Sequence, residues 1–112
     1  MRAEELKGHL DALLLAALED GPRHGYAVME TLREATGGRL DLPTGTIYPA
    51  LRRLEAAGLI TGSWSVVGGR RRRSYRLTAA GAGALAGKRA DWRDFAAMVT
   101  SALDSRPCPD PA

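Results

Sequence analysis

The fold is decided by residues 44–78, which read TGTIYPALRRLEAAGLITGSWSVVGGRRRRSYRLT. Their first part predicts a helix that ends at about Ala57, because apolar residues recur there at helical spacing. These buried-face residues are Ile47, Leu51 and Leu54. Pro49 lacks an amide donor and is tolerated only in the first turn of a helix. We therefore expect the helix to start near Thr46, or to have a distorted first turn if it starts at Thr44.

A β-hairpin is predicted directly after this helix. Residues 59–67 are rich in β-forming side chains, and Gly68-Gly69 is a tight-turn signal. Residues 70–77 form the returning strand, with Tyr75 and Leu77 on one face. Four consecutive arginines follow the turn: Arg70, Arg71, Arg72 and Arg73. The sequence therefore predicts a projecting hairpin whose tip carries guanidinium groups.

Two helices are predicted before this stretch and one after it. A leucine stripe predicts a helix over residues 4–19, and a second apolar stripe predicts a helix over residues 24–36. Thr78 is suited to cap a long last helix over residues 79–104. Residues 105–112 hold three prolines and are expected to be a disordered tail.

This order of elements predicts a mainly α fold with a small β-hairpin, that is, a winged helix-turn-helix plus a long C-terminal helix. The 112 residues allow one modest hydrophobic core. We assign residues 1–77 to the winged helix-turn-helix domain, with the helix over 4–19 also contributing to a dimer. Residues 78–104 are assigned to a dimerisation helix, because ~39 Å of helix extends beyond so small a core and its far half needs a second copy.

The positive charge is concentrated in one segment. The whole chain has 16 Lys and Arg against 13 Asp and Glu, a net charge of only +3. Residues 61–77 nevertheless contain five arginines and no acid. A local basic patch of this kind indicates a polyanionic partner better than a basic average does.

The predicted partner is double-stranded DNA. The major groove admits one helix, and the helix within 44–57 offers several side chains away from its buried stripe. The predicted DNA-binding residues are Tyr26, Thr44, Thr46, Tyr48, Arg52, Arg70, Arg71, Arg72 and Arg73. Arg52 could contact a base edge or a phosphate. Tyr48 could bind DNA or pack against a neighbouring side chain. Tyr26 could pack in the core or donate a hydrogen bond to a phosphate.

Other classes of function find little support. Ser, His and Asp occur without a spacing that pairs a nucleophile with a base, so we do not expect an enzyme. Cys108 is the one cysteine, and His9 and His24 are isolated, so no metal or cofactor is expected. Neither a membrane-spanning run nor a signal peptide is found, which favours the cytoplasm. The remaining alternative is a winged-helix protein-interaction module without specific DNA binding.

Four segments of the chain resemble the signatures of PadR-type transcriptional regulators. They are HGYAV at 24–28, GTIYPALRRLE at 45–55, GLI at 58–60, and GRRR at 69–72 with YRLT at 75–78. The resemblance implies a winged-helix DNA reader, usually a repressor, of the short form with a single C-terminal helix. The chain departs from the pattern at the hairpin, which is short and carries four arginines in a row.

The resemblance also implies a homodimer joined through the last helix, with the first helix packed against it. The geometry of such a dimer predicts a pseudo-palindromic operator. The expected interface residues are Leu10, Leu14, Leu85, Trp92, Ala96, Val99 and Leu103. In some short members a tryptophan of the last helix lines a pocket for flat aromatic compounds, and Trp92 falls at the corresponding position. Trp92 is therefore either a dimer-core residue or a platform for a small-molecule effector.

Overall fold

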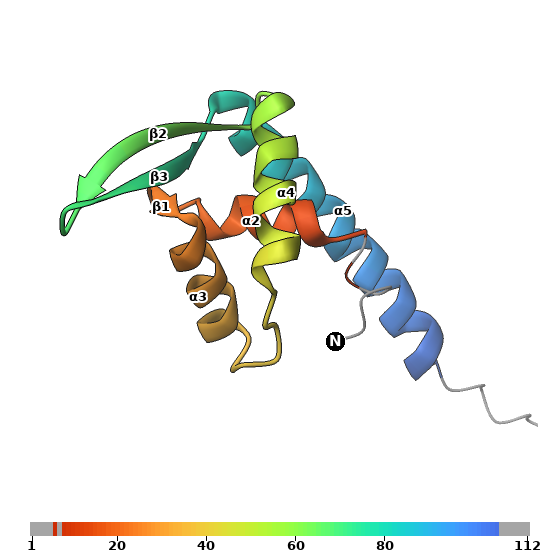
Figure 1. Cartoon of the computed structure of the whole chain (residues 1–112). Coiled ribbons are helices and arrows are strands. Elements are labelled where there is room, and N and C mark those ends of the chain that lie inside the picture. Colours follow the sequence, from red (N-terminus) through yellow and green to blue (C-terminus); the bar gives the residue numbers. More distant parts are fainter. Residues whose placement is uncertain (1–5, 7, 106–112) are drawn as a thin grey trace, which may run out of the picture.

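The computed structural model describes residue 6 and residues 8–105. Three helices come first, α2 (Leu10–Ala17), α3 (Gly25–Ala35) and α4 (Thr44–Ala56), followed by the strands β2 (Ile60–Val67) and β3 (Arg70–Leu77) and the long helix α5 (Ala79–Asp104). In Figure 1 the first three helices gather together, the hairpin projects to one side, and α5 runs out to the other. This mainly helical chain with a small antiparallel sheet confirms the predicted winged helix-turn-helix.

The helix predicted over 4–19 is interrupted. Within the described residues Leu6 is helical and α2 covers Leu10–Ala17, whereas the leucine stripe predicted one continuous helix. Gly8 and His9 form a turn instead, and glycine costs a helix about 1 kcal/mol relative to alanine. At the other end the amides of Leu18 and Glu19 donate to carbonyls three residues back, which tightens the chain into a turn. The predicted tail 105–112 lies outside the described residues except for Ser105.

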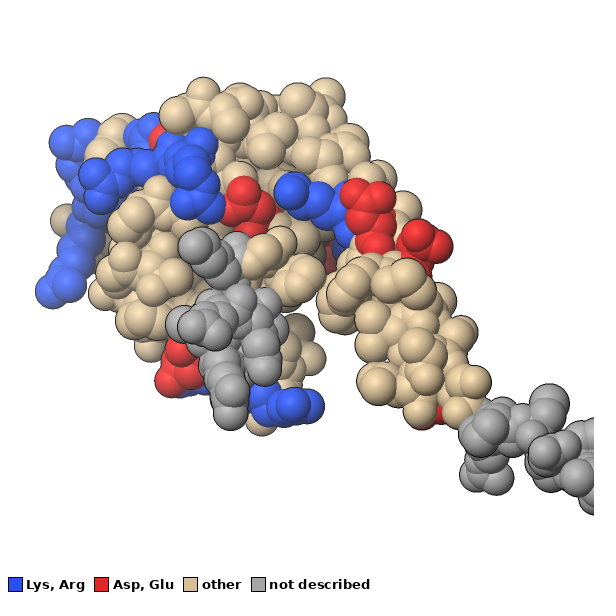
Figure 2. All heavy atoms as spheres, turned by 90° about the vertical axis from the view of Figure 1, so that its right-hand side faces the viewer, with Lys and Arg blue, Asp and Glu red and all other residues tan. Residues whose placement is uncertain are grey.

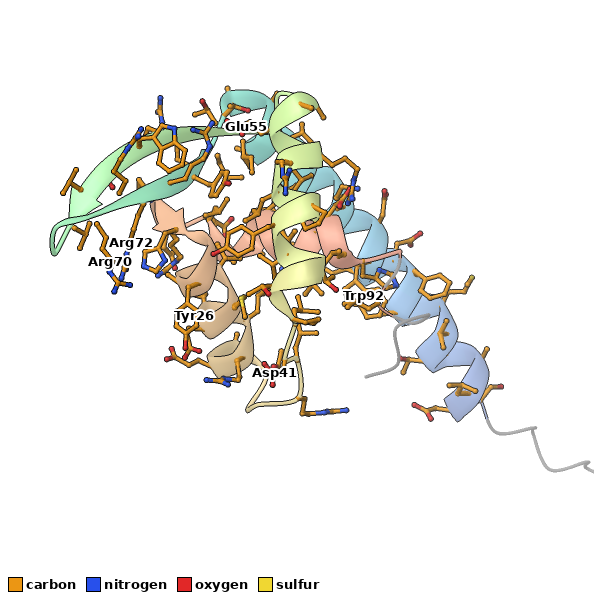
Figure 3. All side chains as sticks on the ribbon, in the orientation of Figure 1. Tyr26, Asp41, Glu55, Arg70, Arg72 and Trp92 are labelled. Atoms are coloured by element: carbon orange, nitrogen blue, oxygen red, sulfur yellow. The ribbon has the colours of Figure 1, made fainter. Side chains whose placement is uncertain are left out.

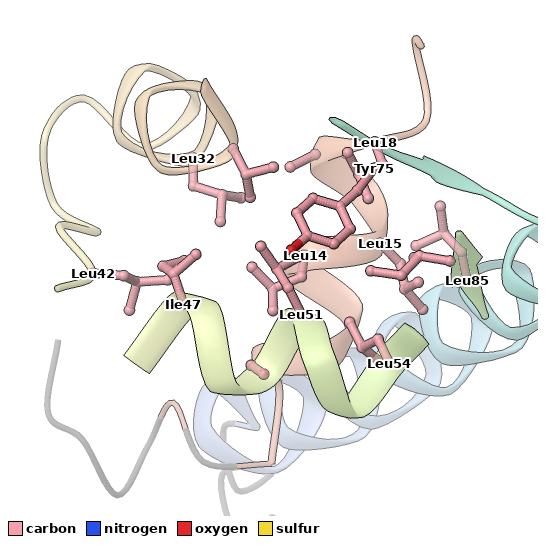
Figure 4. Close-up of a cluster of buried hydrophobic side chains, with 14 of the residues drawn as sticks. Leu14, Leu15, Leu18, Leu32, Leu42, Ile47, Leu51, Leu54, Tyr75 and Leu85 are labelled. Carbon is pink, nitrogen blue, oxygen red and sulfur yellow. The ribbon is translucent and has the colours of Figure 1, made fainter. Parts of the chain in front are cut away.

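A single hydrophobic core joins the three short helices to the root of the hairpin and of α5 (Figure 4). The predicted buried face of α4 is confirmed, since Ile47, Leu51 and Leu54 are 0%, 0% and 1% exposed. They pack with leucines of α2, among them Leu14 and Leu15, in a cluster of fifteen buried residues. Fully burying one such side chain stabilises the fold by about 1.5–3 kcal/mol.

Helix α4 begins at Thr44 although Pro49 is its sixth residue. The carbonyl of Pro43 accepts from the amides of both Thr46 and Ile47, at 2.9 and 3.1 Å, which tightens the first turn. Pro49 has no amide to donate to the carbonyl of Gly45, but Gly45 is exposed and water can satisfy it. This is the second of the two predicted outcomes, a helix from Thr44 with an altered first turn.

The sheet has one strand more than predicted. β1 (Arg23–His24) pairs antiparallel with β3, so the strand order is β1-β3-β2. Two residues are too few to produce a pattern of alternation, which is why the sequence did not indicate this strand. The hairpin turn is the predicted Gly68-Gly69, and both residues have positive φ (58° and 78°), as tight hairpin turns require.

Helix α5 is anchored where the hairpin strands end. The Thr78 hydroxyl caps α5 by accepting from the amide of Gly81 at 3.0 Å, and donates to the carbonyl of Gly58 at 2.6 Å. The Thr78 amide donates to the carbonyl of Leu59 at 3.1 Å. Gly81 is buried, and a Cβ atom there would lie 1.8 Å from the oxygen of Leu59. The first turn of α5 therefore packs directly on the backbone that follows α4.

We predict that Gly81→Ala destabilises the protein by at least about 3 kcal/mol, because the clash is with backbone and no rotamer change relieves it. Gly83→Ala is the matched control, since nothing lies within 4 Å of a Cβ atom at that helical position. It should stabilise the protein by up to about 1 kcal/mol. Urea unfolding measures both, and equal free energies of unfolding for the two variants would contradict the packing described.

Candidate nucleic-acid interface

The exposed face of α4 carries three of the predicted DNA-binding residues. Thr44, Tyr48 and Arg52 are exposed and follow one another at four-residue intervals, so they lie in one row along the helix. Thr46 is half-buried and lies off this row. Within the described residues Arg52 forms no ion pair, whereas its neighbour Arg53 pairs with Asp11 of α2. The row therefore presents two hydroxyl-bearing side chains and one unpaired guanidinium to solvent.

Tyr48 also packs against its neighbouring helix. Its ring lies on the backbone of Gly25 at the start of α3, where a Cβ atom would come within 2.5 Å of the Tyr48 Cε1 atom. The ring remains 38% exposed. Tyr48 therefore packs against the start of α3, and part of the residue stays accessible to solvent.

The four consecutive arginines of β3 do not share one environment. Arg70, Arg71 and Arg72 are exposed. Arg73 turns back toward α4, where its Nη2 atom lies 2.6 Å from the Oε2 atom of Glu55. The same oxygen accepts from the amide of Gly62 at 2.9 Å. Arg73 was predicted to bind DNA together with its three neighbours, and in the free chain its guanidinium is paired with Glu55.

Gly62 makes room for this arrangement. A Cβ atom at Gly62 would lie 2.7 Å from Arg73 Nε, so the guanidinium lies directly over the glycine. The side chains of Arg73 and Glu55 are 31% and 27% exposed, which shields the pair from much of the solvent. The signal in the sequence was Glu55 itself, an acid placed off the buried stripe of α4 and just before the basic hairpin.

Trp64 lies on the hairpin rather than in the core. Its ring is 58% exposed, and the guanidinium carbons of Arg71 and Arg73 lie 4.7 and 5.4 Å from its centroid. Such cation–π contacts hold arginine side chains in place without neutralising them. Next along the face, burial raises the pKa of the Tyr75 hydroxyl, so this ring remains uncharged at the root of the hairpin.

The other face of the hairpin approaches the start of α3. Figure 3 shows Arg70 and Arg72 on the same side of the hairpin as Tyr26, with Glu55 on the opposite side. Tyr26 is 56% exposed, so it is not a core residue. A groove of about 430 Å³ separates the hairpin from the starts of α3 and α4, and no carboxylate of the described residues lines it. Its lining residues are His24, Gly25, Tyr26, Tyr48, Trp64, Arg71, Arg72, Arg73 and Tyr75.

A second notable surface is the far half of α5. Trp92, Phe95, Met98 and Leu103 are 51–79% exposed, and in Figure 2 this part of the helix shows few charged side chains. Ala96 and Val99 are half-buried on the same helix. Phe95 and Met98 were not predicted. The predicted residues of this helix, Leu85, Trp92, Ala96, Val99 and Leu103, follow an approximate heptad spacing, which marks a narrower stripe than the exposed apolar surface of α5.

Two residues predicted for the dimer interface belong to the chain's own core. Leu14 and Leu85 are 0% and 3% exposed, so they have no surface left for a partner. Leu10 is half-buried against the same core and keeps exposed surface, so its place in the interface stays a prediction. The leucine stripe marked these residues as buried, but a stripe does not say which surface covers it.

Trp92 forms one wall of an open pocket of about 600 Å³. Its ring meets the His9 ring edge-on, with centroids 5.0 Å apart. The other wall comes from α2, the loop after α3 and the first half of α5, and it includes Leu13, Leu40 and Leu85. Arg89 at the rim donates to both carboxylate oxygens of Glu19, and this hydrogen bonding lowers the pKa of Glu19.

Metal-binding clusters and membrane-spanning helices also bear on function. Among residues 6 and 8–105, no three His, Cys, Asp or Glu side chains come close enough together to hold a metal ion. No helix in this described part combines the length and apolar character needed to cross a bilayer.

Comparison with known proteins agrees with the geometry of the hairpin and helices. The model of the transcriptional regulator PadR-like family matches residues 14–87. Transcriptional regulator Rv3488 of Mycobacterium tuberculosis is 42% identical over 77 residues, which are 69% of this chain and 59% of that protein, so the match spans less than two thirds of the relative.

Solved structures extend the likeness to most of the chain. A transcriptional regulator from Clostridium thermocellum superposes with a TM-score of 0.82 at 25% identity, covering 90% of this chain and 96% of that one. A PadR family transcriptional regulator from Eggerthella lenta gives 0.80 at 31% identity, covering 92% and 88%. This chain therefore belongs to the PadR-like family of transcriptional regulators.

Proposed function

We propose that this protein is a homodimeric repressor that binds a pseudo-palindromic DNA operator and is released from it by a small-molecule effector. The observation that carries the proposal is the division of the surface. The arginine-bearing hairpin projects from one side of the core, with Tyr48 of the α4 row lining the groove beside it, and α5, whose second half is exposed and apolar, extends on the other side (Figure 1).

The DNA-binding part of the proposal rests on α4 and the hairpin. A helix fits the major groove, and the row of Thr44, Tyr48 and Arg52 is what α4 would present there. The exposed arginines at the hairpin tip, Arg70, Arg71 and Arg72, suit phosphates or a narrow minor groove, where the potential is most negative.

The dimer part of the proposal rests on α5. The helix has 26 residues, but only Gly81 and Leu85, both in its first two turns, are buried. Exposed aromatic and aliphatic side chains in its second half would be covered when two copies pack the same face together, as two-fold symmetry requires. Leu10, Trp92, Ala96, Val99 and Leu103 remain the expected contacts, with Phe95 and Met98 added.

The effector part of the proposal rests on the pocket beside Trp92. Apolar walls with one large aromatic ring suit a flat hydrophobic compound, and a second copy of α5 would close the open side. Such a compound regulates DNA binding only if its affinity differs between the DNA-competent and incompetent dimers.

Arg52→Ala should weaken binding to the operator by ~1–3 kcal/mol if the guanidinium reads a base, with a smaller loss on unrelated DNA. A mobility shift with the DNA upstream of the protein's own gene measures this. Arg33→Ala is the control, because Arg33 pairs with Glu30 at 2.8 Å and should leave binding unchanged. A wild-type protein that shifts no fragment at moderate salt would refute the proposed function.

Arg70 and Arg73 should differ in the salt dependence of binding. Arg70→Gln removes an exposed charge and should lower the slope of log K against log salt by ~0.9 if that charge meets a phosphate. Arg73→Gln should leave the slope nearly unchanged, because Glu55 already pairs with that guanidinium, and should instead lower the free energy of unfolding by about 1–3 kcal/mol. Equal changes of slope would show that Arg73 leaves Glu55 when DNA binds.

Leu103→Lys should convert the dimer to a monomer at micromolar concentration. The residue is 79% exposed within one chain, so the charge costs little there, but it would be buried without a partner in the proposed interface. Ser101→Lys, which is exposed on the opposite face of α5, is the control and should stay dimeric. Sedimentation velocity distinguishes the two, and a Leu103→Lys dimer would exclude this face.

A further inference from the structure

His24 lies at the junction between the hairpin and α3. Its Nδ1 atom accepts from the amide of Ala27 at 3.3 Å and so caps α3. Its Nε2 atom lies 3.1 Å from Nη1 of Arg72. This closeness follows from β1, because His24 pairs with Ser74 of β3, and Arg72 lies two residues further along that strand on the same face.

The two contacts of the imidazole ring cannot both be hydrogen bonds. A neutral imidazole carries one N–H, and a guanidinium has only donors. If Nδ1 accepts from Ala27, then Nε2 carries the hydrogen and faces an N–H group of Arg72. The His24 Nε2–H and the Arg72 N–H are then two donors that face one another, and no acceptor for them is found among the described residues.

The other tautomer is less favourable. A hydrogen on Nδ1 would face the Ala27 amide, which is the third amide of α3 and has no other acceptor within the described residues. Loss of an N-cap costs about 1 kcal/mol. Arg72, in contrast, is exposed and keeps water as a partner. The cap therefore fixes the ring with its hydrogen on Nε2.

We propose that His24 and Arg72 together bind a single phosphate group of the DNA backbone, an inference that rests on the proposed function. A phosphate oxygen accepts hydrogen bonds and carries negative charge, which satisfies the imidazole N–H and the guanidinium at once. No carboxylate lines the groove to compete for them, and the exposed Tyr26 hydroxyl lies on the same side. The contact would fix α3 and the hairpin to the same point of the DNA backbone.

Nitrogen-15 NMR of the His24 ring in the free full-length protein tests the first step. At a pH where the ring is neutral, we expect the Nε2–H tautomer with an unprotonated Nδ1. A ring with its hydrogen on Nδ1 would overturn the proposal, because Arg72 could then donate to Nε2 and the two donors would no longer share an acceptor.

Single methylphosphonates placed along the footprinted operator test the second step, since each one removes the charge of one phosphate. The variants are His24→Ser, which keeps an N-cap oxygen for Ala27, and Arg72→Gln. Each should weaken binding about 10-fold. At one position the methylphosphonate should weaken DNA binding by the wild-type protein but should not weaken binding by either variant any further. Arg70→Gln, the matched control, should retain its sensitivity at that position.

The outcomes separate the inference from the proposed function. The shared site would be rejected, while DNA binding stands, if His24→Ser bound DNA with wild-type affinity. It would also be rejected if the two variants lost sensitivity to methylphosphonates at different positions. A wild-type protein that binds no duplex would reject the proposed function itself. Urea unfolding of His24→Ser shows that the cap is kept, so that a loss of affinity is not a loss of fold.

Discussion

The contact between Gly81 and the carbonyl of Leu59 is the constraint on which the rest of the molecule depends. At this point the end of α4, the start of β2, the end of β3 and the start of α5 meet within a few residues, and Thr78 bonds to the backbone of both Gly58 and Leu59. The hairpin and α5 therefore leave the core from one shared junction. This junction sets the directions of the surface assigned to DNA and of the surface assigned to a second copy, and α5 is held further along by Arg89 with Glu19 and by Trp92 with His9.

The arginines of β3 differ in their electrostatic surroundings and therefore in their roles. Glu55 holds Arg73 over Gly62 and so attaches the hairpin to the end of α4, while Trp64 stacks with Arg71 and leaves its charge available. Alternation along the strand sends Arg70 and Arg72 to the opposite face, toward α3. A single carboxylate decides which guanidinium is structural, because a partly shielded pair whose carboxylate also accepts from the Gly62 amide is stronger than an exposed one.

Periodicity predicted more of this fold than of its site. The bounds of β3 and α5 and the buried stripe of α4 follow directly from alternation, capping and helical spacing. The two-residue strand β1 could not be predicted, because pairing with β3 rather than its own pattern makes it a strand. Leu14 and Leu85 lie in the chain's own core rather than at a partner surface, and Arg73 pairs with Glu55 in the free chain, for a related reason. A sequence marks a residue as buried or charged, but only the packed chain shows which neighbour covers it.

The length of α5 makes it a lever. Its buried residues lie in its first two turns, Arg89 and Trp92 contact Glu19 and His9, and the rest of the helix extends away from the core. Over a helix of ~39 Å, a tilt of about 5° at the root moves the tip by about 3 Å. Successive base pairs are ~3.4 Å apart along the duplex. In a dimer joined at the far ends of the two α5 helices, a ligand bound near the start of α5 would thus shift the two α4 helices by about one base-pair step while leaving each core unchanged.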